Sequence, residues 1–197
     1  LAGRRVEISV PQRGDRRRLL EQARRNAEES LDRRMAETGT QARLMTELTE
    51  FLELADVPGR IEVYDNSHIQ GTKAVGAMIV AGPTGFIKNQ YRKFNIRTAQ
   101  TNDDYAMMRE VMGRRFARAL EEDPDRDGGM WPDLVLIDGG KGQMSSVRDA
   151  LEELGIEDVP LIAIAKGPHH GREGREVFHF PDGREKMLPV NSPLLFY

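Results

Sequence analysis

The 197-residue chain contains no cysteine and a single tryptophan, and aromatic residues make up only 6% of it. Without cysteine the chain can form neither disulfides nor thiolate metal sites. Any metal would be held by carboxylates and histidines, which favours Mg²⁺ or Mn²⁺ over Zn²⁺. Long apolar runs are absent too, so the sequence predicts no transmembrane helix. The first ten residues, LAGRRVEISV, lack the apolar core of a secretory signal, and nothing in them indicates export.

Neither sign of charge dominates, because 29 basic residues face 32 acidic ones and the formal net charge is −3. The distribution is uneven: residues 61–120 carry 9 basic and 5 acidic side chains, and residues 121–158 carry 3 and 12. Such asymmetry is found where one face meets a polyanion and another stays in solvent. Solvated helix faces explain the pattern equally well. The length and the 39% apolar content predict one domain with a smaller appended element.

The first sixty residues predict a short strand, VEISV, a turn, PQRGD, and then a long helical stretch from Arg16 to about Leu54. We expect Asp15 to cap this stretch and Gly39 to divide it into two helices. Its many arginines and glutamates are typical of a solvated helix face. The segment DVPGR breaks the pattern, so we place a boundary between a helical preface or linker at residues 1–57 and a second domain at residues 58–197.

After this boundary the pattern changes to short strands. Three adjacent strands, RIEVYDNSH, AVGAMIVAG and FIKNQYRKFNIR, predict an antiparallel meander. A helix follows, with Thr101 or Asn102 as its cap and two acidic residues in its first turn. The later segments predict a buried strand (PDLVLIDGG), a helix ending at Gly155, another buried strand (VPLIAIAKG) and a hairpin turning at PDG. The order β-β-β-α-β-α-β indicates an α/β fold with a mixed sheet covered by helices.

Two of the predicted strands end in carboxylates. Asp65 follows Ile61 and Val63 on one face of the first strand, and Asp138 closes LVLID on the fourth. With this strand order the first and fourth strands are expected to be neighbours, which would place the two aspartates side by side. Close carboxylates repel each other unless a divalent cation lies between them, and Mg²⁺ accepts such ligands together with water and substrate phosphate. Alternatively, each aspartate simply caps a turn, since DGG is a common turn sequence.

Several basic residues are candidates for phosphate contacts. The loop DGGKGQMSS does not fit the Walker pattern, but it offers Lys141, backbone N–H groups and a helix N-terminus. Lys166 ends a buried strand. In YRKFNIR, Arg92, Lys93 and Arg97 alternate with aromatic residues, a pattern compatible with contacts to a nucleic-acid backbone. Ordinary strand alternation produces the same pattern without any nucleic acid.

Five segments, in their order along the chain, resemble the C-terminal endonuclease half of the UvrC family, the incision subunits of the bacterial UvrABC nucleotide excision repair system. The segments are YDNSHIQG, YRKFNI, DDYAMMREV, PDLVLIDGGKGQ and IAKG. The resemblance runs from about Arg60 to the end, and LIDGGKGQ after D-x-SH-x-x-G is its most specific part. VPQRGDRRRLLEQARRNA also resembles the stretch that this family places before the domain.

The resemblance implies an RNase H-like fold and a DNA endonuclease that uses Mg²⁺ or Mn²⁺ to cut 5′ to a lesion. Matched by motif, the family's catalytic and metal-binding aspartates correspond to Asp65 and Asp138, and a further carboxylate of less defined role corresponds to Asp104. The implied partners are damaged double-stranded DNA and UvrB, with loading that depends on UvrA, in the bacterial cytoplasm.

One part of the family pattern has no match. The family's catalytic histidine follows an LP-x-x-SP segment, and this sequence stops at LPVNSPLLFY. None of the four histidines, at positions 68, 169, 170 and 179, has that context. We therefore expect the third catalytic group and a helix-hairpin-helix module to lie beyond Tyr197, and this chain alone to cut DNA weakly or not at all. The alternative function is a non-catalytic DNA-binding or assembly module that positions a partner nuclease.

Overall fold

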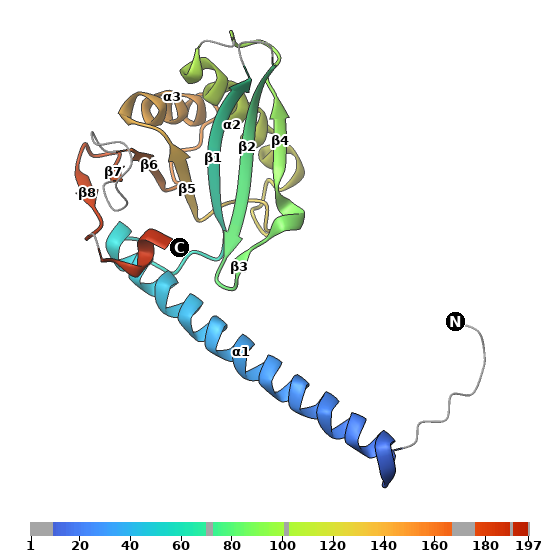
Figure 1. The fold of residues 1–197 in the computed structure, drawn as a ribbon. Helices are drawn as coiled ribbons and strands as arrows, with labels where there is room; N and C mark the ends of the chain where they lie inside the picture. Colours follow the sequence, from blue (N-terminus) through green and yellow to red (C-terminus); the bar gives the residue numbers. More distant parts are fainter. Residues whose placement is uncertain (1–9, 70–72, 101–102, 167–175, 190, 197) are drawn as a thin grey trace, which may run out of the picture. The chain divides into compact units, whose positions relative to one another are not determined.

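The computed structural model describes residues 10–69, 73–100, 103–166, 176–189 and 191–196 (Figure 1). It divides into two compact units, Leu1–Thr40 and Gln41–Tyr197. Most of the predicted first strand, VEISV, lies outside the described residues. The boundary predicted after residue 57 stays a prediction.

A single helix, α1, runs from Gly14 to Leu52. The predicted division at Gly39 is wrong. One glycine costs only about 1 kcal/mol in a helix, and beyond the neighbouring Thr38 and Thr40 the helix continues in strong helix formers on both sides. Asp15 lies inside the first turn rather than at the cap position. Arginine–glutamate pairs one turn apart add support on the exposed face, as between Arg17 and Glu21 at 3.0 Å. Within the described residues, no helix is both long enough and apolar enough to cross a bilayer.

The second unit is built on one mixed sheet. Its strands in chain order are β1 (Ile61–Ile69), β2 (Lys73–Gly82), β3 (Gly85–Phe86), β4 (Arg92–Asn95), β5 (Leu134–Asp138), β6 (Leu161–Ala165), β7 (Val177–His179) and β8 (Glu185–Met187). They lie in the order β3-β2-β1-β5-β6-β7-β8, and β4 also pairs with β2 (Figure 1). Strands β1, β5 and β6 are parallel to one another, whereas β2 is antiparallel to β1. The predicted meander is therefore confirmed, except that a short 3₁₀ helix, η1 (Lys88–Gln90), splits its third strand into β3 and β4.

Two helices, α2 (Asp104–Glu122) and α3 (Lys141–Glu152), pack against each other on one face of the sheet (Figure 1). Helix α2 is capped by Asp103, whose carboxylate accepts a hydrogen bond of 2.9 Å from the Ala106 N–H. The two predicted cap residues, Thr101 and Asn102, lie outside the described residues. After α3 the chain turns through Gly155, which has a φ of +72°. A second 3₁₀ helix, η2, covers Pro193–Phe196.

The sheet is buried on both faces. Tyr64, Met78 and Val135 pack with α2 and α3 in one cluster. On the opposite face, the last turns of α1 pack over a second cluster, to which the β7–β8 hairpin contributes two phenylalanines. The cluster includes Met45, Leu48, Leu52, Ile61, Leu134, Leu136, Phe178 and Phe180. Because side chains alternate along a strand, odd-numbered residues of a given strand face one cluster and even-numbered residues face the other.

Candidate active site

Asp65 and Asp138 occupy adjacent positions on two parallel strands. Asp138 is the last residue of β5, whereas Asp65 lies midway along β1, which does not end there as predicted but continues to Ile69. In the β1–β5 pairing Val63 lies opposite Leu136 and Tyr64 opposite Ile137. The next position along both strands brings Asp65 beside Asp138. Alternation puts both carboxylates on the face where the α1 end and the hairpin pack. The predicted adjacency of the first and fourth strands is thus confirmed.

The electrostatics of Asp65 show that the two carboxylates interact. Partial burial raises the pKa of Asp65 above its usual value of 3.8, and the negative charge of Asp138 raises it further. The positive charge of Lys166 and a hydrogen bond from the Asn66 backbone N–H lower the pKa in part. Lys166 directly follows β6, the strand next to β5, so the predicted phosphate-binding lysine lies near the pair. A pair of this kind favours a cation between its members.

The donor set fits a hard divalent cation. Among the described residues, no group of three histidine, cysteine, aspartate or glutamate side chains is placed to hold a metal. A closed tetrahedral zinc site needs four protein ligands, whereas Mg²⁺ is held by one or two carboxylates and otherwise by water and phosphate. Asp65 and Asp138 therefore fit Mg²⁺ or Mn²⁺.

The third predicted carboxylate, Asp104, is the first residue of α2. Its backbone oxygen accepts a hydrogen bond of 3.4 Å from the side chain of Asn66, which faces the opposite side of β1 from Asp65. Asp103, Asp104 and Tyr105 line an open cavity of about 520 Å³ with Gln143 of α3. Asp104 thus lies at the same end of the sheet as the aspartate pair but on its other face.

The remaining predicted basic residues fall into two places. Lys141 is the first residue of α3, and its ammonium group forms an ion pair of 2.6 Å with Glu185 of β8. Arg92 and Lys93 lie exposed on β4, and Arg97 follows that strand. Lys141 and Lys166 are therefore near the carboxyl ends of the central strands, whereas the three residues of YRKFNIR belong to the β4 edge of the sheet.

His179 is the one histidine whose side chain the structure describes. It is buried in β7, and its Nδ1 atom lies 3.4 Å from the Glu185 carboxylate. The side chains of the other three histidines lie outside the described part of the chain.

A buried ionic network was missed by reasoning from the sequence. Glu62 of β1 has no exposed surface, and its carboxylate accepts hydrogen bonds from Arg60 at 2.7 and 2.9 Å, from Arg115 at 2.7 Å and from the Tyr64 hydroxyl. Burial raises the pKa of Tyr64 well above its usual range, and the negative charge of Glu62 adds to this. The signal was Arg115 itself, a charged residue spaced four positions after Val111 and four before Ala119 on the buried stripe of α2.

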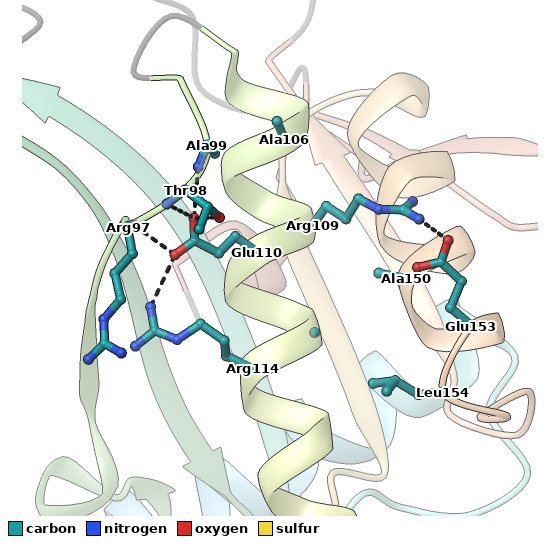
Figure 2. Close-up of a pocket in the computed structure, with 11 residues that line it drawn as sticks. Arg97, Thr98, Ala99, Ala106, Arg109, Glu110, Arg114, Ala150, Glu153 and Leu154 are labelled. Atoms are coloured by element: carbon teal, nitrogen blue, oxygen red, sulfur yellow. Dashed lines mark hydrogen bonds and ion pairs between the residues drawn. The ribbon is translucent and has the colours of Figure 1, made fainter.

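A second structural carboxylate fixes the chain between β4 and α2, beside a pocket of about 530 Å³ (Figure 2). Glu110 of α2 accepts hydrogen bonds from three consecutive backbone N–H groups, those of Arg97 (2.8 Å), Thr98 (2.8 Å) and Ala99 (2.9 Å). Despite some desolvation, these bonds lower the pKa of Glu110 from 4.5 to about 2.

Glu110 should therefore make the protein sensitive to acid. Because its pKa is depressed on folding, its contribution is complete above pH 4.5 and is lost as the pH falls towards about 2. We expect Glu110→Gln to lower the free energy of unfolding by about 2 kcal/mol at pH 7, the scale of hydrogen bonds to a charged group. In urea unfolding, the difference in free energy of unfolding between the unchanged protein and Glu110→Gln should be smaller at pH 3 than at pH 7. The exposed Glu152, paired with Arg148, provides the control Glu152→Gln. An equal difference in free energy of unfolding at both pH values would contradict stabilisation by the ionised Glu110 carboxylate.

Comparison with known proteins identifies similar families along most of the chain. Residues 49–197 match the family described as UvrC RNAse H endonuclease domain, and residues 1–34 match the UvrC Ribonuclease H-like domain. The chain is 80% identical over 195 residues to UvrABC system protein C of Novosphingobium aromaticivorans, covering 99% of this chain and 30% of that protein. It is 63% identical to the protein of the same name from Sphingopyxis alaskensis, covering 100% of this chain and 31% of that protein. The chain thus spans about a third of the length of these curated relatives.

Similarity to solved structures is weaker. The catalytic domain of human endonuclease V is 16% identical, with a TM-score of 0.42 over 81% of this chain and 76% of that chain. Endonuclease V of Ciona intestinalis in complex with DNA is 13% identical, with a TM-score of 0.39 over 59% and 50% of the two chains. Similarity at this level supports no inference about function.

Proposed function

Because the chain belongs to the family of UvrC RNase H endonuclease domains, whose RNase H-like fold agrees with the mixed sheet, we propose that it cuts DNA during nucleotide excision repair. The proposed reaction is metal-dependent hydrolysis of a phosphodiester 5′ to a lesion. The proposed partners are damaged double-stranded DNA and UvrB, with loading that depends on UvrA. The observation that carries this proposal is the placement of Asp65 beside Asp138 on neighbouring parallel strands.

In this proposal, Asp65 and Asp138 are the residues that would hold Mg²⁺ or Mn²⁺. Binding of a cation removes the repulsion that raises the pKa of Asp65. The bound ion would lower the pKa of an attacking water and stabilise charge on the phosphate and the leaving oxygen. Lys166 is near enough to Asp65 for its positive charge to lower the pKa of that carboxyl. We assign Lys166 a contact with the phosphate being cut.

Other residues have supporting roles in the proposal. Asp104 is a further carboxylate at the same end of the sheet and is proposed to orient substrate or water. Lys141 would contact DNA after exchanging its ion pair with Glu185 for a phosphate. Arg92, Lys93 and Arg97 would contact the DNA backbone from the β4 edge. Since no histidine of this chain has the family's LP-x-x-SP context, we expect the isolated chain to cut feebly.

Calorimetric titration with Mn²⁺ tests this proposal directly. The chain should bind Mn²⁺, and Asp65→Asn and Asp138→Asn should each weaken binding at least about tenfold, because a lost carboxylate removes one of two protein ligands. Asp149→Asn changes an exposed carboxylate of α3 and should have no effect.

If the unchanged chain binds Mn²⁺ no better than the two variants, these carboxylates do not hold metal by themselves. The affinity for duplex DNA then distinguishes a metal-dependent endonuclease from a non-catalytic DNA-binding module. In a non-catalytic DNA-binding module, either Asp→Asn change should strengthen DNA binding by removing repulsion and leave metal affinity unchanged.

A further inference from the structure

A basic pocket of about 480 Å³ lies between β4, α2 and residues 128–130. Six cationic side chains line it: Arg60, Arg92, Lys93, Arg114, Arg115 and Arg118. Glu122 is the one carboxylate among its lining residues, and Phe94 adds an aromatic ring. Since Arg60 precedes β1, the pocket is at the amino end of that strand, and Asp65 lies five residues further along, midway in the strand.

The positive charge of this pocket exceeds the negative charge that neutralises it. Arg60 and Arg115 share the single carboxylate of Glu62. Arg114 pairs with Glu110 at 3.3 Å, and Arg118 pairs with Glu122 at 2.8 Å. Three carboxylates thus pair with four of the six cations. Arg92 donates hydrogen bonds to two backbone carbonyls, which leave its charge uncompensated.

Arg115 gives a second, independent indication of a missing acceptor. Its side chain is 7% exposed, and its Nη2 atom donates to Glu62 and to the Met130 carbonyl. Its Nη1 atom is buried and has no hydrogen-bond partner among the described residues. Buried side-chain donors nearly always have an acceptor. A guanidinium with one satisfied and one free nitrogen, beside a pocket with excess positive charge, is suited to an anion.

We propose that this pocket binds a backbone phosphate of DNA away from the phosphate that is cut. The identity of the ligand as DNA rests on the proposed function. Arginine is the side chain best suited to phosphate, because its planar fork matches two phosphate oxygens. Because the pocket adjoins α2, a phosphate held there lies on the opposite face of the sheet from the aspartate pair.

Matched ion pairs on α2 and α3 allow a controlled test. Arg118–Glu122 and Arg148–Glu152 are both exposed pairs four residues apart, but only the first pair lines the pocket. Binding of a 30-base-pair duplex is measured in EDTA, so that the result does not depend on any metal. Arg118→Gln should weaken binding about three- to tenfold and reduce the slope of log K against log salt by about one. Glu122→Gln should strengthen binding about threefold. Arg148→Gln and Glu152→Gln should stay within about twofold of the unchanged chain.

Equal effects at the two pairs would overturn the proposal, since general electrostatics would then explain the binding. Polyglutamate binding that is lost in Arg118→Gln, with duplex binding unchanged, would assign the pocket to an acidic protein instead. Displacement of the duplex by inorganic phosphate below about millimolar concentration would assign the pocket to a free anion, since one phosphate contact is weak.

The fluorescence of Trp131, the single tryptophan, reports occupancy of the pocket because this residue adjoins Met130 in the pocket wall. Mn²⁺ binding by Arg118→Gln should be unchanged, which separates this proposal from the metal site.

Discussion

Asp138→Asn should reduce incision 5′ to a lesion by at least about a thousandfold when it is placed in a full-length protein carrying this domain. Loss of a metal ligand removes charge stabilisation of several kcal/mol from the transition state, and about 4 kcal/mol corresponds to a factor of a thousand. Asp65→Asn should have a similar effect, because the two carboxylates, at adjacent positions of β1 and β5, belong to one metal site in the proposed function. The measurement is single-turnover incision of a lesion-containing duplex with UvrA and UvrB present.

The loss of incision should occur without loss of folding. Asparagine has nearly the shape of aspartate, and the change removes the repulsion between Asp65 and Asp138 that raises the pKa of Asp65. We therefore expect the free energy of unfolding of each variant to equal or exceed that of the unchanged protein. Asp149→Asn should leave incision unchanged. Incision at more than about a third of the normal rate in both Asp65→Asn and Asp138→Asn would place the cutting site elsewhere.

The adjacency of β1 and β5 could be predicted because strand order and side-chain alternation together determine it. Three antiparallel strands followed by crossover units leave few topologies open, and the observed sheet has the expected neighbours. The face of each aspartate follows from alternation, because Asp65 lies four positions after Ile61 and Asp138 four positions after Leu134, and both of these residues face the second cluster. The metal-binding and catalytic roles of Asp65, Asp138 and Asp104 stay predictions, because strand order places side chains without determining what they bind.

The errors have local causes. Reading Gly39 as a breaker gave too much weight to one unfavourable residue in a strongly helical stretch. The split between β3 and β4 arises at η1, whose residues contain no proline or glycine to mark a break. Glu62 lies on the opposite side of β1 from Ile61 and Val63, and it is buried because β1 is covered on both faces. The sequence could not reveal that its partners would be Arg60 beside it and Arg115, more than fifty residues away.

Glu62→Leu should lower the free energy of unfolding by about 3–5 kcal/mol, the scale for removing one partner of a buried ion pair. The change leaves Arg115, which is 6% exposed, without a counter-ion and the fully buried Tyr64 hydroxyl without an acceptor. Since small domains are stable by about 5–15 kcal/mol, this is a large part of the total. Urea unfolding at pH 7 measures it, with Glu152→Gln as the control for loss of a carboxylate from an exposed pair.

A double variant, Glu62→Leu with Arg115→Met, determines why the network is charged. Apolar side chains of similar size often replace a buried ion pair at no cost, so the double variant should be more stable than Glu62→Leu alone. If Arg115 also belongs to a phosphate-binding pocket, the stabilised double variant should bind duplex DNA more weakly than the unchanged chain. Recovery of stability together with loss of DNA binding would mean that the arginine is kept for its ligand. A double variant no more stable than Glu62→Leu would contradict this account and show that the charged groups are needed to pack α2 on the sheet.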